Sequence, residues 1–210
     1  MAIEIAGQTT GAERDAAESL KRRLEPALRP QDRIVIIAGA KCYGEKTEDI
    51  DLLVIGQFSP AFRLPTTAEE PGPAYLSNFL LVIEVKDHDG AAVRFECNQV
   101  KTRYTNRWHD ASDQVFKQVF SLRNYLEKNL RINAPPIFKA IWLRNVERAG
   151  VPEKVTQILP AGLTAPDFFR VLKANSARWI SIDAISVGVE CDKGRKARLL
   201  GGGKDHERRT

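Results

Sequence analysis

The fold expected for this chain is decided by one stretch of eight residues, Phe79-Leu80-Leu81-Val82-Ile83-Glu84-Val85-Lys86. Its apolar run is rich in branched side chains, which is typical of a strand buried on both faces of a sheet. Because strand side chains alternate, Glu84 and Lys86 should point to one side while Val85 stays in the core. The stretch therefore predicts a carboxylate and an ammonium side by side at the end of a buried strand.

A second strand is expected where the acidic pair Glu48-Asp49 leads into Ile50-Asp51-Leu52-Leu53-Val54-Ile55. Asp51 lies inside this apolar run, where an unpaired carboxylate would be costly. If the two strands pair, Asp51 meets Glu84 and Lys86. Two carboxylates and a lysine form an oxygen-ligand site for a hard cation, beside a group that can position or deprotonate water.

Five short motifs follow one another along the chain: Gly11-Ala12-Glu13, Asp49-Ile50-Asp51-Leu52-Leu53-Val54, Ile83-Glu84-Val85-Lys86, His88-Asp89-Gly90 and Asp113-Gln114. In this order they resemble the PD-(D/E)XK nuclease superfamily, and most closely its nuclease-related domain, NERD. The resemblance spans roughly residues 11–145. It implies an α/β fold with a restriction-endonuclease-like core, in which helices flank a mixed central β-sheet.

The resemblance also implies a metal-dependent nuclease that hydrolyses phosphodiester bonds of DNA, in repair, processing or restriction. Asp51, Glu84 and the main-chain carbonyl of Val85 would hold Mg²⁺ or Mn²⁺, and the two carboxylates count as catalytic. Lys86 would orient or activate the attacking water, and Gln114 would position water or substrate. The alternative is a catalytically inactive nuclease-fold domain that binds nucleic acid or docks a partner.

Glu13 has two interpretations. Thr10 and Glu13 have the spacing of a capping box, in which the two side chains bond the first free amides of a helix. In relatives the matching glutamate extends the acidic cluster, which would make Glu13 a further metal ligand. An apolar stripe follows, and Pro26 should end or kink this helix near Leu24.

Cations and aromatic residues alternate after the expected strand 92–100, at Lys101, Arg103, Tyr104, Arg107 and Trp108. Cations neutralise phosphates and rings stack on bases, so Lys101, Arg103 and Arg107 are candidate nucleic-acid contacts. The alternative is that Trp108 packs under the next helix and the cations are solvated.

That next helix should be capped by Asp110 or Ser112 and run to about Asn129. Gln118 lies one turn after Gln114 and is a further candidate nucleic-acid contact, with a solvated helix face as the alternative.

Further elements are expected as strands at 33–38 and 137–143 and as a helix start at Thr164-Ala165-Pro166-Asp167. The proline-containing segment 57–78 is expected to form a surface excursion beside the site. Residues 1–175 should form the nuclease-like domain and 176–210 a C-terminal extension, whose tail from about 192 is expected to be disordered.

Charge supports a nucleic-acid partner only weakly. The net charge is +5, but residues 192–210 hold seven cations and three acids, so the body is nearly neutral. DNA is the expected partner, with RNA as an alternative. NERD-like domains are often joined to helicases or kinases, which implies a helicase or another module as a second partner.

Three separated cysteines without a Cys-x-x-Cys spacing argue against a disulfide framework and a structural zinc. No apolar run approaches the length of a membrane span, and the N-terminus does not have the pattern of a secretory signal. A cytoplasmic protein without a membrane partner is expected.

Overall fold

The computed structural model describes residues 3–64 and 75–175, all of which belong to one compact unit, Met1–Asn175. Its elements in chain order are β1 (Ile3–Gly7), α1 (Ala12–Leu24), β2 (Arg33–Lys41), β3 (Asp49–Arg63), β4 (Tyr75–Asp89), β5 (Val93–Glu96), β6 (Gln99–Tyr104), β7 (Arg107–Asp110), α2 (Ala111–Asn124), β8 (Ile137–Asn145) and β9 (Ile158–Leu159). A last helix begins at 165, and its described part runs to 175.

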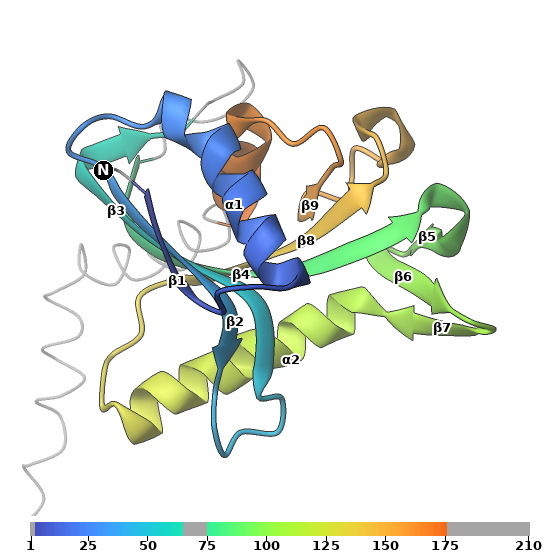
Figure 1. Cartoon of the computed structure of the whole chain (residues 1–210), viewed down its shortest axis with the longest axis horizontal. Coiled ribbons are helices and arrows are strands. Elements are labelled where there is room, and N and C mark those ends of the chain that lie inside the picture. Colours follow the sequence, from blue (N-terminus) through green and yellow to red (C-terminus); the bar gives the residue numbers. More distant parts are fainter. Residues whose placement is uncertain (1–2, 65–74, 176–210) are drawn as a thin grey trace, which may run out of the picture. The chain divides into compact units, whose positions relative to one another are not determined.

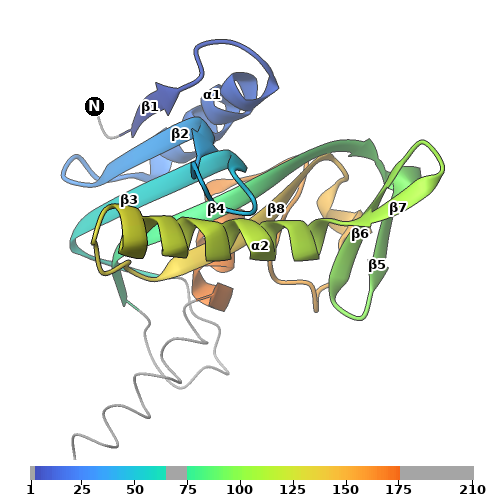
Figure 2. The same cartoon turned by 90° about the horizontal axis from the view of Figure 1, so that it is seen from below.

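The main sheet has six strands in the order β1-β2-β3-β4-β8-β9. β2, β3 and β4 are antiparallel neighbours, whereas β1 with β2, β4 with β8 and β8 with β9 are parallel pairs. α1 and the helix from 165 cover one face of the sheet and α2 covers the other (Figures 1 and 2). The expectation of an α/β fold with a mixed sheet flanked by helices is therefore confirmed.

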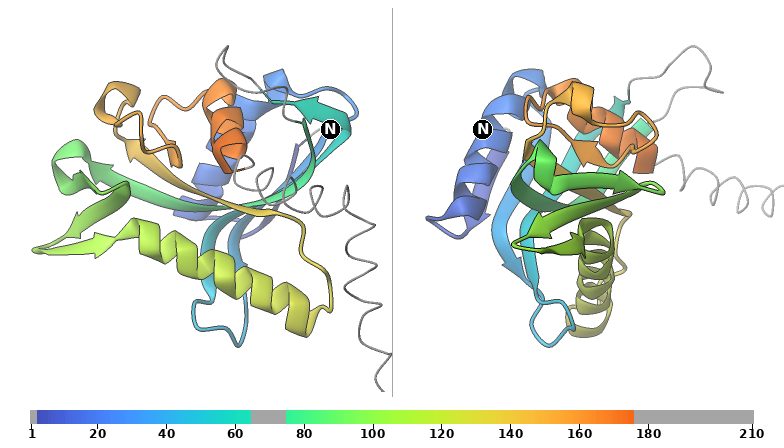
Figure 3. Two further views of the ribbon diagram at one scale, coloured as in Figure 1. Left: turned by 180° about the vertical axis from the view of Figure 1, so that it is seen from behind. Right: turned by 90° about the vertical axis from the view of Figure 1, so that its right-hand side faces the viewer.

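A second, three-stranded antiparallel sheet, β5-β6-β7, follows the end of β4 and leads directly into α2 (Figure 3). The single strand predicted at 92–100 is wrong, because the structure has β5 and β6 there. The chain instead turns at Cys97 and Asn98, which both adopt positive φ angles, and returns as β6. This turn brings β6 back beside β4 and the start of α2.

The centre of the main sheet is built by β3 and β4, whose pairing runs from Arg63 with Tyr75, across a register shift between Phe62 and Gln57, to Leu52 with Ile83. The ladder thus ends one position before Asp51 and Glu84. Both strands are longer than expected, because β3 continues to Arg63 and β4 starts at Tyr75. Most of the described part of the expected excursion at 57–78 is therefore strand.

The two main helices begin differently. α1 starts after Gly11, and no side chain caps it, so the predicted capping box of Thr10 and Glu13 is wrong. As predicted, Pro26 lies just beyond Leu24, in a 3-10 turn. α2 is capped by Asp110, whose carboxylate accepts from the Asp113 amide at 2.9 Å.

Within the described ranges, no helix is long and apolar enough to cross a membrane. The helix start predicted at 164–167 is confirmed, because Thr164 and Asp167 bond each other's amides through their side chains. The extension 176–210, including the tail from about 192, lies outside the described residues.

The close packing of β3 on β4 can be tested at Gly56. A Cβ added there would overlap the ring of Phe79, which is buried between Phe58 and Phe138. Gly56→Ala should therefore lower the free energy of unfolding by about 1 to 3 kcal/mol, measured by urea denaturation. Gly90→Ala is the control, because an added Cβ meets no atom there. Equal losses in both variants would contradict this packing.

Candidate active site

A cavity of about 290 Å³ lies where the start of α1, the adjoining ends of β3 and β4, the end of β6 and the first turn of α2 meet. Its lining residues are Ala12, Glu13, Asp51, Glu84, Val85, Lys86, Asp87, Tyr104 and Gln114. Four of these side chains are acidic and one is basic. The cavity is therefore a polar site with an excess of negative charge.

Asp51 is an acidic residue of this cavity whose pKa is affected by other acidic residues. Its Oδ2 accepts the Val85 amide proton at 2.7 Å, which ties β3 to β4 just beyond the last ladder pair. Burial raises the pKa of Asp51 from its usual value of 3.8 to about 6, and the nearby negative charge of Glu84 acts in the same direction. Lys86 and the Val85 amide oppose this rise without cancelling it.

Lys86 is buried, with 5% of its surface exposed, and it is fully hydrogen-bonded. Its Nζ donates to Glu84 Oε1 at 2.5 Å, to the Tyr104 hydroxyl at 2.9 Å and to Gln114 Oε1 at 3.2 Å. Burial alone would lower the pKa of Lys86, but the charge of Glu84 and the hydrogen bonds that Lys86 donates to Glu84 and Tyr104 together outweigh burial and raise it. Lys86 is therefore a cation at neutral pH.

Gln118 hydrogen-bonds the Glu84 oxygen that does not contact Lys86. Its side chain is only 1% exposed, and its Nε2 donates to Glu84 Oε2 at 2.6 Å and to the Asp49 carbonyl at 3.2 Å. The structure thus places this glutamine in the interior, away from any surface that a nucleic acid could reach. Its role is to fix the Glu84 carboxylate and to tie α2 to the start of β3.

The structure gathers the predicted catalytic and metal-binding residues on one cavity, because Glu13 and Val85 line it together with Asp51, Glu84, Lys86 and Gln114. One detail differs from expectation. Glu84 and Lys86 are buried, whereas Val85 is only half-buried. The reason is that β6 and α2 cover the side of β4 to which the two charged residues point.

The predicted nucleic-acid contacts on the small sheet do not share one face. Arg103 lies opposite Trp108 in the ladder and Tyr104 lies opposite Arg107, so these two pairs point to opposite sides. The guanidinium of Arg103 lies 5.7 Å from the Trp108 ring, and Lys101 is paired with Glu96 at 2.7 Å. Arg103 and Arg107 are exposed cations.

Sequence reasoning missed Tyr104 as a site residue. Its hydroxyl contacts Lys86, and its ring meets the rings of His88 and His109 edge-on, with centroids 4.3 and 5.2 Å away. The signal that could have revealed it is Asn98, since asparagine favours the left-handed turn that separates β5 from β6. Once that turn is placed, alternation puts Tyr104 on the side opposite Arg103.

The carboxylates of this cavity can be compared with the ligands that a divalent cation requires. Among the described residues, no group of three or more His, Cys, Asp and Glu side chains is arranged as a metal site. The two carboxylates Asp51 and Glu84 are close enough for one to raise the pKa of the other, and all their donor atoms are oxygens. Mg²⁺ takes one or two carboxylates and keeps several waters, so this pair fits it.

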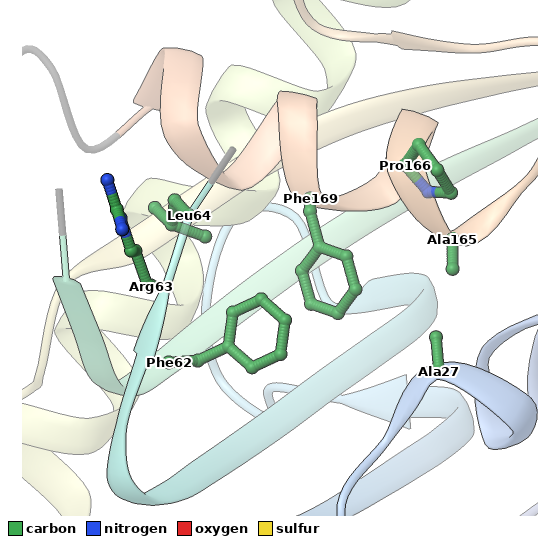
Figure 4. A pocket seen from close by; sticks show the side chains of 7 residues that line it. All are labelled: Ala27, Phe62, Arg63, Leu64, Ala165, Pro166 and Phe169. Atoms are coloured by element: carbon green, nitrogen blue, oxygen red, sulfur yellow. The ribbon is translucent and has the colours of Figure 1, made fainter. Parts of the chain in front are cut away.

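A larger cavity of about 420 Å³ lies elsewhere and has a different character. Figure 4 shows Phe62 and Phe169 facing each other within it. Their rings are stacked, with 4.4 Å between the ring centroids. Arg63 is its one charged lining residue, and none of the residues of the acidic site lines it. Size therefore does not identify the site, because the groups capable of chemistry line the smaller cavity.

Comparisons with protein-family models, curated proteins and solved structures find no match for this chain. Its chemistry is therefore interpreted from its own residues.

The raised pKa of Asp51 predicts how stability depends on pH. The folded state holds this proton more tightly than the unfolded chain, so stability is lost as the pH rises from about 4 through 6. Asp51→Asn removes that loss and can keep the bond from the Val85 amide. The variant should exceed the wild type by roughly 1 to 3 kcal/mol at pH 8 and match it near pH 4, measured by denaturation without metal. A pH-independent difference would contradict this assignment.

The support that Gln118 gives to Glu84 is also testable. Gln118→Met leaves Glu84 Oε2 buried without its donor, which should lower the free energy of unfolding by about 2 to 4 kcal/mol. Gln57→Met, at an exposed position of β3, is the matched control and should change stability little. Similar denaturation midpoints for the two variants would exclude this role for Gln118.

Proposed function

We propose that this chain is a metal-dependent nuclease with a restriction-endonuclease-like core that hydrolyses phosphodiester bonds of DNA. The observation that carries the proposal is the convergence of two carboxylates, a buried lysine and a glutamine on one cavity. Phosphodiester hydrolysis needs a nucleophilic water, neutralisation of charge at the phosphate and help for the leaving oxygen. The residues of this cavity, together with a bound cation, can support the first two requirements.

The excess of acidic groups in the cavity supports a role for a cation. Without one, a phosphate would be repelled by Glu13, Asp51, Glu84 and Asp87. Asp51 and Glu84 would hold Mg²⁺ or Mn²⁺. When bound, the cation lowers the pKa of its water and neutralises charge on the phosphate.

The side chains of the protein have separate tasks in this proposal. The Lys86 ammonium offsets part of the negative charge that develops on the phosphate, and its raised pKa keeps it charged while it does so. Gln114 accepts a hydrogen bond from Lys86 through Oε1, and its amide NH₂ has no acceptor among the described residues, so it can position water or substrate. The exposed cations Arg103 and Arg107 on the adjoining small sheet favour a polyanion as substrate.

Cleavage of supercoiled plasmid and of a labelled single strand tests the proposal. We expect the wild type to cut in Mg²⁺ or Mn²⁺ and not in EDTA. Lys86→Ala should reduce the rate at least roughly 100-fold, because the charge of Lys86 is lost from the site. The control is Lys154→Ala, which removes an exposed lysine between β8 and β9 and should leave the rate unchanged.

Lys86→Ala also leaves the buried Glu84 without its cation, so a loss of activity in this variant could reflect unfolding. Asp51→Asn is therefore tested beside it, since this variant is expected to be the more stable protein. Loss of cutting in folded Asp51→Asn would support the site. Absence of cutting by the wild type, with salt-sensitive binding of the same strands retained, would overturn the nuclease and favour a nucleic-acid-binding domain.

A further inference from the structure

The three protons of the Lys86 ammonium are all engaged within the protein. They are donated to Glu84 Oε1, the Tyr104 hydroxyl and Gln114 Oε1. An ammonium group has three donors and no acceptor, so none is left for a substrate. The charge of Lys86 is thus presented to the cavity through the groups that accept its protons.

Two of these acceptors carry hydrogens of their own. The Tyr104 oxygen accepts from Lys86, and among the described residues its hydroxyl proton has no acceptor. Tyr104 lines the cavity and is 43% exposed, so this proton is available to a molecule bound there. Gln114 is in a similar position, because Oε1 faces Lys86 and its NH₂ group remains free.

We propose that the Tyr104 hydroxyl is a catalytic donor that binds a phosphate oxygen of the substrate, with the Gln114 amide as a second donor beside it; this rests on the nuclease proposed above. A hydroxyl that accepts from an ammonium becomes a stronger donor, because hydrogen bonds in a chain polarise one another. Lys86 therefore acts on the phosphate through Tyr104.

The position of Tyr104 is fixed before any substrate arrives. Its ring is flanked by His88 and His109, and Lys86 lies 5.4 Å from the ring centroid as well as against the hydroxyl. A donor that is already oriented costs no reorganisation during the reaction, so its effect should appear mainly in the chemical step.

Tyr104→Phe tests the proposal, because it removes the hydroxyl and keeps the ring. We expect kcat for single-strand cleavage to fall roughly 10- to 100-fold while KM changes less than about 3-fold. Tyr43→Phe is the matched control, since Tyr43 is exposed and does not line the cavity. Thermal melting of both variants confirms that the fold is kept. An unchanged kcat in Tyr104→Phe would overturn the role of Tyr104 but would not contradict the proposed nuclease activity.

A second measurement applies if the wild type binds nucleic acid but does not cut it. That result would refute the proposed nuclease activity, and the Tyr104 contact would then be tested by binding. Fluorescence anisotropy of a labelled oligonucleotide should then show an affinity about 3- to 10-fold weaker for Tyr104→Phe than for the wild type and Tyr43→Phe, as loss of one phosphate donor predicts. Equal affinities of the three proteins, or no binding by any of them, would overturn the Tyr104 contact.

Discussion

The structure of the site depends on one buried ion pair, between the Lys86 ammonium and the Glu84 carboxylate. Moving two charges out of water costs several kcal/mol per ion, and only complete hydrogen bonding offsets that cost. Lys86 meets this demand with Tyr104 and Gln114, and Glu84 meets it with Gln118. These partners belong to β6 and α2, so satisfying the pair fixes both elements against the end of β4.

Stability alone does not explain this network, because apolar residues of similar volume often replace a buried ion pair without loss. The pair also borders a cavity, beside a second carboxylate whose pKa is raised by burial and by Glu84. Perturbed ionisable groups gathered in a cavity are typical of functional sites. The burial of Lys86 and Glu84 beside this cavity is therefore consistent with the active site proposed above.

The sequence was informative where a hydrophobic pattern extended over many residues and indicated a single type of secondary structure. The run that became β4, Asp51 inside β3 and the capped helix α2 were all identifiable, and with them the group of residues that meets at the cavity. The hairpin of β5 and β6 was missed because its turn places Cys97 and Asn98, not glycines, at positive φ. The burial of Lys86 was missed too, since alternation fixes the side to which a residue points but not whether another element covers that side.

Asp51 and Glu84 are unequal partners for a cation. Both oxygens of Glu84 already accept hydrogen bonds, from Lys86 and Gln118, whereas one oxygen of Asp51 has no donor among the described residues. A cation could therefore bind Asp51 without breaking any bond seen here. Each Glu84 oxygen has a second lone pair besides the one that accepts from Lys86 or Gln118, so within the proposed nuclease both carboxylates could hold the cation while Lys86 keeps its three partners.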